Sequence, residues 1–321
     1  MKPTILVPGN IHPRGRQRLD ENFQLHHVQD FKLDGLDAAF AEKIDGIATF
    51  MFPIDKPLLQ AFPNLKIVSS FGVGYDHVDA ASAADLGIVT AHTPEVLDDE
   101  VADTTIGLLI STLRELPAAE RYLRDGLWKT KGPYHNTPLT LRARTIGIFG
   151  MGRIGRKIAK RLDAFDVAIH YHNRRTLNDV SYPYHASLNA LATACDTLIN
   201  VVPSTPETQN AVDAKILKAL GPNGVLINVG RGDTVDNEAV AEALTDGTIA
   251  AAGIDVFPNE PDVPDALLRA PNTVLLPHVA SASVHTRDAM ADRVVDNLIS
   301  WFDGKGAIAA VPESEHLNKS V

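Results

Sequence analysis

Three polar side chains in the second half of the chain have types suited to acid–base chemistry on a small carbonyl compound. Arg231 lies in INVGRGD, Glu260 in DVFPNEP and His278 in LLPHVAS, and each follows a segment that is typical of a buried strand. Parallel α/β sheets present their ligand sites at the carboxyl ends of strands, so the three side chains can meet. A guanidinium binds a carboxylate through two hydrogen bonds. A histidine transfers a proton, and a glutamate beside it favours the protonated imidazole.

Each of these residues also has an ordinary structural interpretation. Taken singly, Arg231 is a loop arginine at the surface, Glu260 a surface carboxylate and His278 a packed loop histidine. Their joint occurrence at strand ends favours a catalytic set, in which Arg231 polarises a carbonyl and His278 protonates the developing alkoxide. We expect no metal in this site.

A glycine-rich turn precedes these residues in the chain. The segment TIGIF, residues 145–149, is strand-like and leads into GMGRIG, which opens a helix. In this context the first glycine permits the tight turn, the second admits a pyrophosphate and the third allows close helix packing. A generic strand–helix turn is the alternative. We predict that the whole turn binds a dinucleotide, through Gly150, Met151, Gly152, Arg153, Ile154 and Gly155.

The next strand end indicates which dinucleotide is bound. About 20 residues beyond such a turn, NAD-selective sites carry an acidic residue that bonds the ribose 2′-hydroxyl. Here the chain has Asn173, Arg174 and Arg175 instead. Guanidinium groups bind a 2′-phosphate that a carboxylate would repel. The sequence therefore predicts NADP(H) over NAD(H), with a solvated basic turn as the alternative.

Strand-like and helix-like segments alternate along the chain, which predicts an α/β fold with parallel sheets. A long helical pattern over 95–117, stopped by Pro117, and a polar loop over 130–140 divide two such series. A final amphipathic helix is expected over 285–301. The predicted strands are 4–8, 47–50, 66–71, 87–91, 145–149, 167–172, 197–202, 224–229, 249–256 and 273–277.

Composition excludes several classes of protein. The chain has 321 residues, 45% of them hydrophobic, and a net charge of -10, without the basic excess of a nucleic-acid binder. No apolar run is long enough to span a membrane, and the first residues lack the apolar core of a signal peptide. Cys195 is the single cysteine, so no intrachain disulfide can form, and we expect it to be buried. We expect a cytoplasmic protein.

The motifs together resemble the D-isomer-specific 2-hydroxyacid dehydrogenases, over about residues 44 to 300. FGVGYDHVD, GMGRIG, NVGRGD, DVFPNEP and PHVAS stand in the order of that family. The resemblance implies two Rossmann-like domains. A flavodoxin-like substrate domain, residues 1–98 with 286–321, would be split by an NAD(P)-binding domain, residues 99–285, with the substrate in the cleft between them.

The resemblance also implies a role for each matching residue. Arg231 would bind the substrate, His278 would be the acid/base and Glu260 would pair with His278. The backbone N–H groups of Val73 and Gly74 would hold the substrate carboxylate. Further residues would line the cofactor: Thr104, Val229 and Asp255 near the nicotinamide, and Val202, Pro203 and Thr208 on the adenosine side.

Within the family, the chain is most similar to glyoxylate/hydroxypyruvate and hydroxyphenylpyruvate reductases, although HVASAS departs from the commoner HIGG-x-T form. This implies NADPH-preferring reduction of a small 2-keto acid to a D-2-hydroxy acid. A reductase for a larger acid, such as 2-ketogluconate or phenylpyruvate, is one alternative. A nucleotide-sensing protein like the C-terminal-binding corepressors is another, because fold does not fix function. The family forms homodimers through the region of residues 98–140, and we expect a homodimer here.

Overall fold

The computed structural model describes residues 2–318, and the chain forms two compact units. Unit 1 comprises Met1–Leu97 and Ser283–Val321, and unit 2 comprises Asp98–Ala282. The chain therefore leaves unit 1 once and returns to it. Substrate binding by unit 1 and cofactor binding by unit 2 stay predictions.

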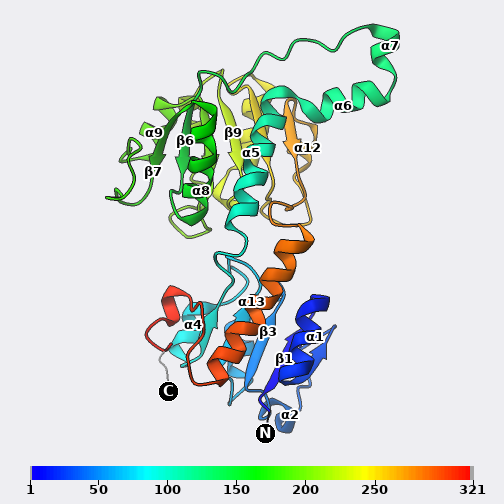
Figure 1. Cartoon of the computed structure of the whole chain (residues 1–321), viewed down its shortest axis with the longest axis vertical. Coiled ribbons are helices and arrows are strands. Elements are labelled where there is room, and N and C mark those ends of the chain that lie inside the picture. Colours follow the sequence, from blue (N-terminus) through cyan, green and yellow to red (C-terminus); the bar gives the residue numbers. More distant parts are fainter. Residues whose placement is uncertain (1, 319–321) are drawn as a thin grey trace. The chain divides into compact units, whose positions relative to one another are not determined.

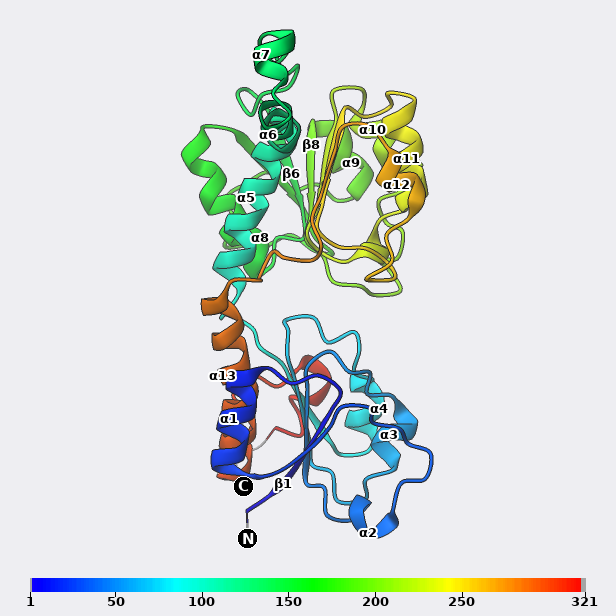
Figure 2. The same ribbon diagram turned by 90° about the vertical axis from the view of Figure 1, so that its right-hand side faces the viewer.

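Unit 1 is built on a five-stranded sheet in the order β2-β1-β3-β4-β5, and its strand pairs are parallel. This is the winding order of flavodoxin-like folds. Helices α1 and α13 cover one face, and α3 and α4 cover the other (Figure 2). The elements are β1 Thr4–Pro8, α1 Pro13–Asn22, β2 Gln24–Val28, α2 Ala38–Ala41, β3 Gly46–Thr49, α3 Lys56–Gln60, β4 Ile67–Ser70, α4 Ala80–Asp85, β5 Val89–Ala91, α13 Val284–Phe302 and the 3-10 turn η3 Pro312–Ser314.

Unit 2 is built on a six-stranded parallel sheet in the order β11-β10-β9-β8-β6-β7. Helices α5 and α8 pack on one face, and α9 to α12 pack on the other (Figure 2). The elements are α5 Asp98–Arg114, α6 Leu116–Arg124, α7 Leu127–Lys131, β6 Thr145–Phe149, α8 Arg153–Leu162, η1 Asp163–Phe165, β7 Ala168–His172, α9 Leu188–Ala194, β8 Thr197–Asn200, α10 Ala214–Leu220, β9 Val225–Asn228, η2 Gly232–Thr234, α11 Asn237–Thr245, β10 Ala251–Ile254, α12 Asp265–Arg269 and β11 Thr273–Leu275.

The strand order of unit 2 reverses at β6, whose neighbours are β7 and β8. A short parallel bridge between Tyr171 and Tyr184 adds a further extended segment outside β7. Open α/β sheets bind ligands at such a switch point, beyond the carboxyl ends of the strands. The predicted fold class, two Rossmann-like domains with parallel sheets, is confirmed.

Several predicted elements differ from the structure in extent. Strand β2 was not predicted, because QLHHV is a partly exposed edge strand with a polar texture. The helix expected over 95–117 ends at Arg114, where Glu115 turns the chain with φ 51°, and Pro117 lies in the first turn of α6. The segment 273–277, expected to be a buried strand, forms the half-exposed edge strand β11.

Helices α6 and α7 form an arm that leaves the body of unit 2 (Figure 1). Neither helix contains a buried residue. Leu116, Leu123 and Trp128 are instead exposed, and Trp128 retains 62% of its accessible surface. The arm thus presents apolar side chains that its own unit does not cover.

Candidate active site

The glycine-rich turn joins β6 to α8 in the way its sequence predicts. Gly150 has φ 105°, which favours glycine, and a Cβ on Gly155 would lie 2.1 Å from the carbonyl oxygen of Gly150. A Cβ on Gly152 would meet nothing within 4 Å. Gly152 directly precedes α8, whose first N–H groups have no side-chain cap. The turn therefore offers open space and hydrogen-bond donors, the features that a dinucleotide pyrophosphate requires.

The basic turn after β7 lies beside this glycine turn. The side-chain oxygen of Asn173 accepts a hydrogen bond of 2.6 Å from the N–H of Met151. Arg174 and Arg175 follow and are exposed. The pKa of Glu207 is lowered by hydrogen bonds from its own N–H and from Thr205 and, less strongly, by the charge of Arg174. The charge of Arg174 thus acts on the loop after β8, on the predicted adenosine side.

That loop contains the three further residues assigned to the adenosine side. Val202 is buried and packs against Gly150. A Cβ on Gly150 would lie 2.9 Å from a methyl carbon of Val202. The hydroxyl of Thr208 donates to the carbonyl of Pro203 at 2.8 Å and so closes the loop. Val202 thus packs this loop against the glycine turn.

Glu260, in the loop after β10, and His278, just after β11, form a direct pair. Nδ1 of His278 lies 2.6 Å from Oε2 of Glu260, so it donates to the carboxylate and leaves Nε2 for another proton acceptor or donor. The other oxygen of Glu260 accepts from the N–H of Phe257 at 2.9 Å. His278 has φ 51°, a left-handed conformation that is uncommon for a residue with a side chain. A strained, carboxylate-paired histidine at a strand end is typical of a catalytic site.

Asp255 holds the backbone that carries His278. Its side chain is fully buried, and its two oxygens accept hydrogen bonds from Val279 N–H at 2.8 Å and Ala280 N–H at 2.9 Å. Burial raises the pKa of the Asp255 carboxyl. The hydroxyl of Thr104 donates to the Ala280 carbonyl at 3.1 Å. Sequence reasoning assigned Asp255 to the nicotinamide and missed this anchoring contact.

Arg231 lies between β9 and η2, and its Nη1 donates to the Gly230 carbonyl at 2.8 Å. A Cβ on Gly232 would lie 1.9 Å from the backbone carbon of Phe257, so the loops that carry Arg231 and Glu260 are packed together. The structure thus brings Arg231, Glu260 and His278 to one end of the same sheet. Val229, also assigned to the cofactor, is buried just after β9.

Two buried asparagines that sequence reasoning missed support the Arg231 loop. Asn200 donates through Nδ2 to Oδ1 of Asn228 at 3.0 Å and to the hydroxyl of Thr234 at 2.7 Å. Asn228 in turn donates to the Arg231 carbonyl at 3.2 Å. The signal was present in the sequence, since β8 and β9 end as TLIN and VLIN.

Val73 and Gly74 lie in unit 1, in the loop between β4 and α4. Within residues 2–318 their N–H groups donate no hydrogen bond, while the neighbouring Gly72 N–H donates to Thr93 at 3.0 Å. Two adjacent backbone donors without acceptors suit a carboxylate.

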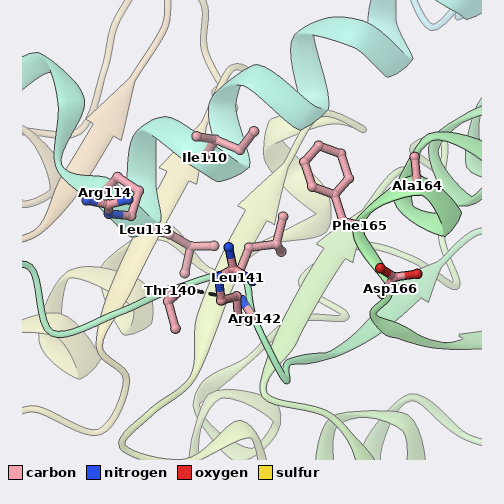
Figure 3. A pocket seen from close by; sticks show the side chains of 9 residues that line it. All are labelled: Ile110, Leu113, Arg114, Thr140, Leu141, Arg142, Ala164, Phe165 and Asp166. Carbon is pink, nitrogen blue, oxygen red and sulfur yellow. Dashed lines mark hydrogen bonds between the residues drawn. The ribbon is translucent and has the colours of Figure 1, made fainter.

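A pocket of 380 Å³ in unit 2 lies away from all of these residues (Figure 3). Its lining includes Leu141, Ile110 and Leu113 of α5, and Phe165 of η1. The pocket is at the amino-terminal end of β6, opposite the glycine turn. It therefore lies outside the predicted catalytic site.

Within residues 2–318, no three or more His, Cys, Asp and Glu side chains are arranged to hold a metal ion. Over the same range, no helix combines the length and apolarity that crossing a membrane requires.

Comparison with known proteins gives consistent matches. The profile of the D-isomer specific 2-hydroxyacid dehydrogenase NAD binding domain matches residues 106–280, more than half of the chain. A glyoxylate/hydroxypyruvate reductase A of Arabidopsis thaliana is 45% identical over 80% of this chain and 82% of its own. A hydroxyphenylpyruvate reductase of Plectranthus scutellarioides is 41% identical over 92% and 94%.

A solved structure extends the similarity to the whole fold. The NADPH-dependent glyoxylate/hydroxypyruvate reductase of Sinorhizobium meliloti, in complex with NADP and malonate, is 53% identical. The match covers 98% of each chain, with a TM-score of 0.94.

Proposed function

The chain belongs to the D-isomer-specific 2-hydroxyacid dehydrogenase family, and we propose that it reduces a small 2-keto acid to the D-2-hydroxy acid with NADPH. Glyoxylate and hydroxypyruvate are the proposed substrates. The observation that carries this proposal is the His278–Glu260 pair, with 2.6 Å between Nδ1 and Oε2, on the loop that Asp255 anchors. The names of the similar reductases support the same substrate class.

The proposed reaction divides the work among a few side chains. Bound NADPH supplies the hydride that reduces C2 of the keto acid. Arg231 and the N–H groups of Val73 and Gly74 bind the substrate carboxylate, and Arg231 also polarises the carbonyl. His278, protonated and oriented by Glu260, delivers its Nε2 proton to the carbonyl oxygen as the alkoxide develops. The product is the neutral hydroxyl, and histidine regains its proton from solvent.

We propose NADP(H) as the preferred cofactor because of Arg174 and Arg175. Both guanidinium groups are exposed at the end of β7, where an acidic residue would select for NAD. Asn173 and the open Gly152 complete the proposed binding turn, and the NADP complex of the Sinorhizobium enzyme supports it. A cytoplasmic location stays a prediction that rests on the lone cysteine.

A panel of 2-keto acids assayed with NADPH and with NADH tests the proposal. We expect the highest kcat/KM for glyoxylate or hydroxypyruvate with NADPH. A higher value for 2-ketogluconate or a phenylpyruvate would identify the larger substrate instead. Absence of turnover with every acid and both cofactors would contradict the enzymatic proposal and favour a binding role.

We also propose a homodimer formed through residues 98–140. The exposed Leu116, Leu123 and Trp128 of the arm support it, because monomers rarely expose contiguous apolar surface. Light scattering after size exclusion should give the mass of two chains for the native protein and of one chain for Leu123→Asp/Trp128→Asp. A monomeric native protein would contradict the proposal.

A further inference from the structure

The loop that carries Val73 and Gly74 is fixed at its start by Thr93. The N–H of Gly72 donates to Oγ1 of Thr93 at 3.0 Å, and the Thr93 N–H donates back to the Gly72 carbonyl at 2.9 Å. Gly72 has φ 142°, and a Cβ there would lie 2.9 Å from the carbonyl oxygen of Gly74. The chain therefore turns tightly at a glycine before the two free N–H groups.

His92 fixes the peptide between Val73 and Gly74. Its Nδ1 lies 2.8 Å from the Val73 carbonyl oxygen, and since a carbonyl only accepts, Nδ1 carries the hydrogen. The Val73 carbonyl and the Gly74 N–H belong to one planar trans peptide and point in opposite directions. By holding the carbonyl, His92 sets the direction of the Gly74 N–H. The His92 carbonyl itself accepts from Asn297 of α13 at 2.9 Å.

Tyr75, the next residue of the loop, is bound by the end of the chain. Its hydroxyl donates to Oε2 of Glu313 at 3.0 Å, across 238 residues of sequence. Burial, and then the charge of Glu313, raise the pKa of the Tyr75 phenol, so the hydroxyl stays a donor. The Tyr75 ring also packs edge-on against the ring of His92, with centroids 5.5 Å apart.

Glu313 lies between two buried residues, Val311 and Ser314, that hydrogen-bond to β5. Ser314 is fully buried, and its hydroxyl accepts from Thr90 N–H at 3.0 Å. The Val311 N–H donates to the Thr90 carbonyl at 2.9 Å, so η3 is attached to β5 beside α4 (Figure 1). The exposed carboxylate of Glu313 thus meets Tyr75 from a segment that is hydrogen-bonded to β5.

We propose that Tyr75, Glu313 and His92 are positioning residues for the substrate carboxylate. They aim the N–H groups of Val73 and Gly74, and through Glu313 the carboxyl-terminal segment 311–314 controls affinity for the keto acid. This inference rests on the proposed function of that loop. It adds a determinant of substrate affinity that touches neither substrate nor cofactor.

Steady-state kinetics of loop variants test the inference. Tyr75→Phe removes the hydroxyl and keeps the ring. It should raise KM for hydroxypyruvate about tenfold, which corresponds to the lower end of the range of free energies for one hydrogen bond to a charged group. KM for NADPH and kcat should change less than about twofold, because His278 and the glycine turn are untouched. Glu313→Ala should raise KM for hydroxypyruvate as much as Tyr75→Phe does. The double variant should have the same KM as either single variant, since both changes remove the same hydrogen bond.

Two further variants separate positioning from general destabilisation. Glu313→Gln keeps an oxygen that accepts from Tyr75, so it should restore most of the native KM. Tyr182→Phe removes a similar tyrosine–carboxylate bond, 2.8 Å to Asp163 in unit 2, and should leave KM for the keto acid unchanged. Titration of oxamate into the NADPH complex measures binding of a carboxylate without turnover. Oxamate should bind more weakly to Tyr75→Phe than to the native protein.

The outcomes distinguish this inference from the proposed function. If the native protein reduces no 2-keto acid, the proposed function fails and this inference with it. If the native protein is active but Tyr75→Phe keeps its KM, the proposed function stands and the positioning role is wrong. Equal rises in both KM values, with a lower kcat, would also overturn it.

Discussion

The first strand–helix turn of each sheet occupies the same topological position, yet the two turns are built differently. β1 and β6 have the same place in two similarly wound sheets. After β1, a Cβ on Gly9 would lie 2.9 Å from the ring of Phe52, and α1 begins at Pro13, which has no N–H. After β6, the space beside Gly152 is open and α8 begins with uncapped N–H groups. Both sheets therefore have a strand–helix turn where ligands bind in such folds, but only the turn after β6 leaves the open space that the proposed dinucleotide requires.

The largest expected effect comes from removing His278, the proposed acid, in unit 2. His278→Ala should lower kcat for hydroxypyruvate about 10²- to 10⁴-fold, the usual contribution of a positioned acid. His135→Ala is the matched control, because His135 pairs with Glu115 at 2.8 Å in the segment before β6. Near-native turnover in His278→Ala would contradict the assignment of the acid.

One glycine-to-alanine variant in each turn tests the difference between the two turns directly. Gly152→Ala places a methyl group in the open space, so KM for NADPH should rise about tenfold or more. Its melting temperature should stay native, since φ -79° suits alanine and no atom lies within 4 Å. Gly9→Ala should lower the melting temperature by several degrees, because φ 72° costs a side chain about 1–2 kcal/mol.

Gly9→Ala and Gly152→Ala also show whether the turns after β1 and β6 really differ in cofactor binding. NADPH affinity should be native in Gly9→Ala, where Phe52 fills the turn. If Gly9→Ala weakens NADPH as much as Gly152→Ala does, the two turns are not specialised as the structure indicates.

A smaller effect is expected from the basic turn. Arg174→Ala should raise KM for NADPH about tenfold through the loss of a charge-assisted contact with the 2′-phosphate, and should leave KM for NADH within about twofold. Arg269→Ala serves as control, because Arg269 is exposed and paired with Asp265 of the same helix. Equal changes for both cofactors would show that Arg174 does not read the 2′-phosphate.

The smallest effect concerns the pH dependence of stability at the edge of unit 2. Burial, and then the neighbouring His185, lower the pKa of His170, whose Nδ1 lies 3.0 Å from Nε2 of His185. A histidine with a lowered folded-state pKa stabilises the fold above its unfolded value of about 6.5. That contribution is lost as the pH falls below this value. The melting temperature of the native protein should therefore drop between pH 7.5 and pH 5.5 by more than that of His170→Asn. The two drops should differ by about 1–3 °C. An identical loss would rule out this role.

The sequence predicted the features that depend on local patterns. Buried strands such as β6 and the glycine turn have strong local signals, and the fold class follows from them. Glu260 and His278 were expected to pair, and the structure joins them at 2.6 Å, while their catalytic role stays a prediction. β2 was missed because an edge strand needs no buried, apolar face.

Other features depend on contacts that no local pattern contains. The bond between Tyr75 and Glu313 joins segments 238 residues apart, and the two hydrogen bonds to Asp255 follow from the way β10 and β11 pair. Such contacts arise only when the sheet is assembled. The sequence shows which residue types can form such hydrogen bonds, but it does not show which residues they bond to.

The D-specific reduction of a 2-keto acid with NADPH is best tested by analysing the product of the native protein. Hydroxypyruvate is incubated with NADPH, and the glycerate formed is quantified on a chiral column against the NADPH consumed. We expect one D-glycerate for each NADPH oxidised. Formation of the L-isomer, or no glycerate at all, would contradict it.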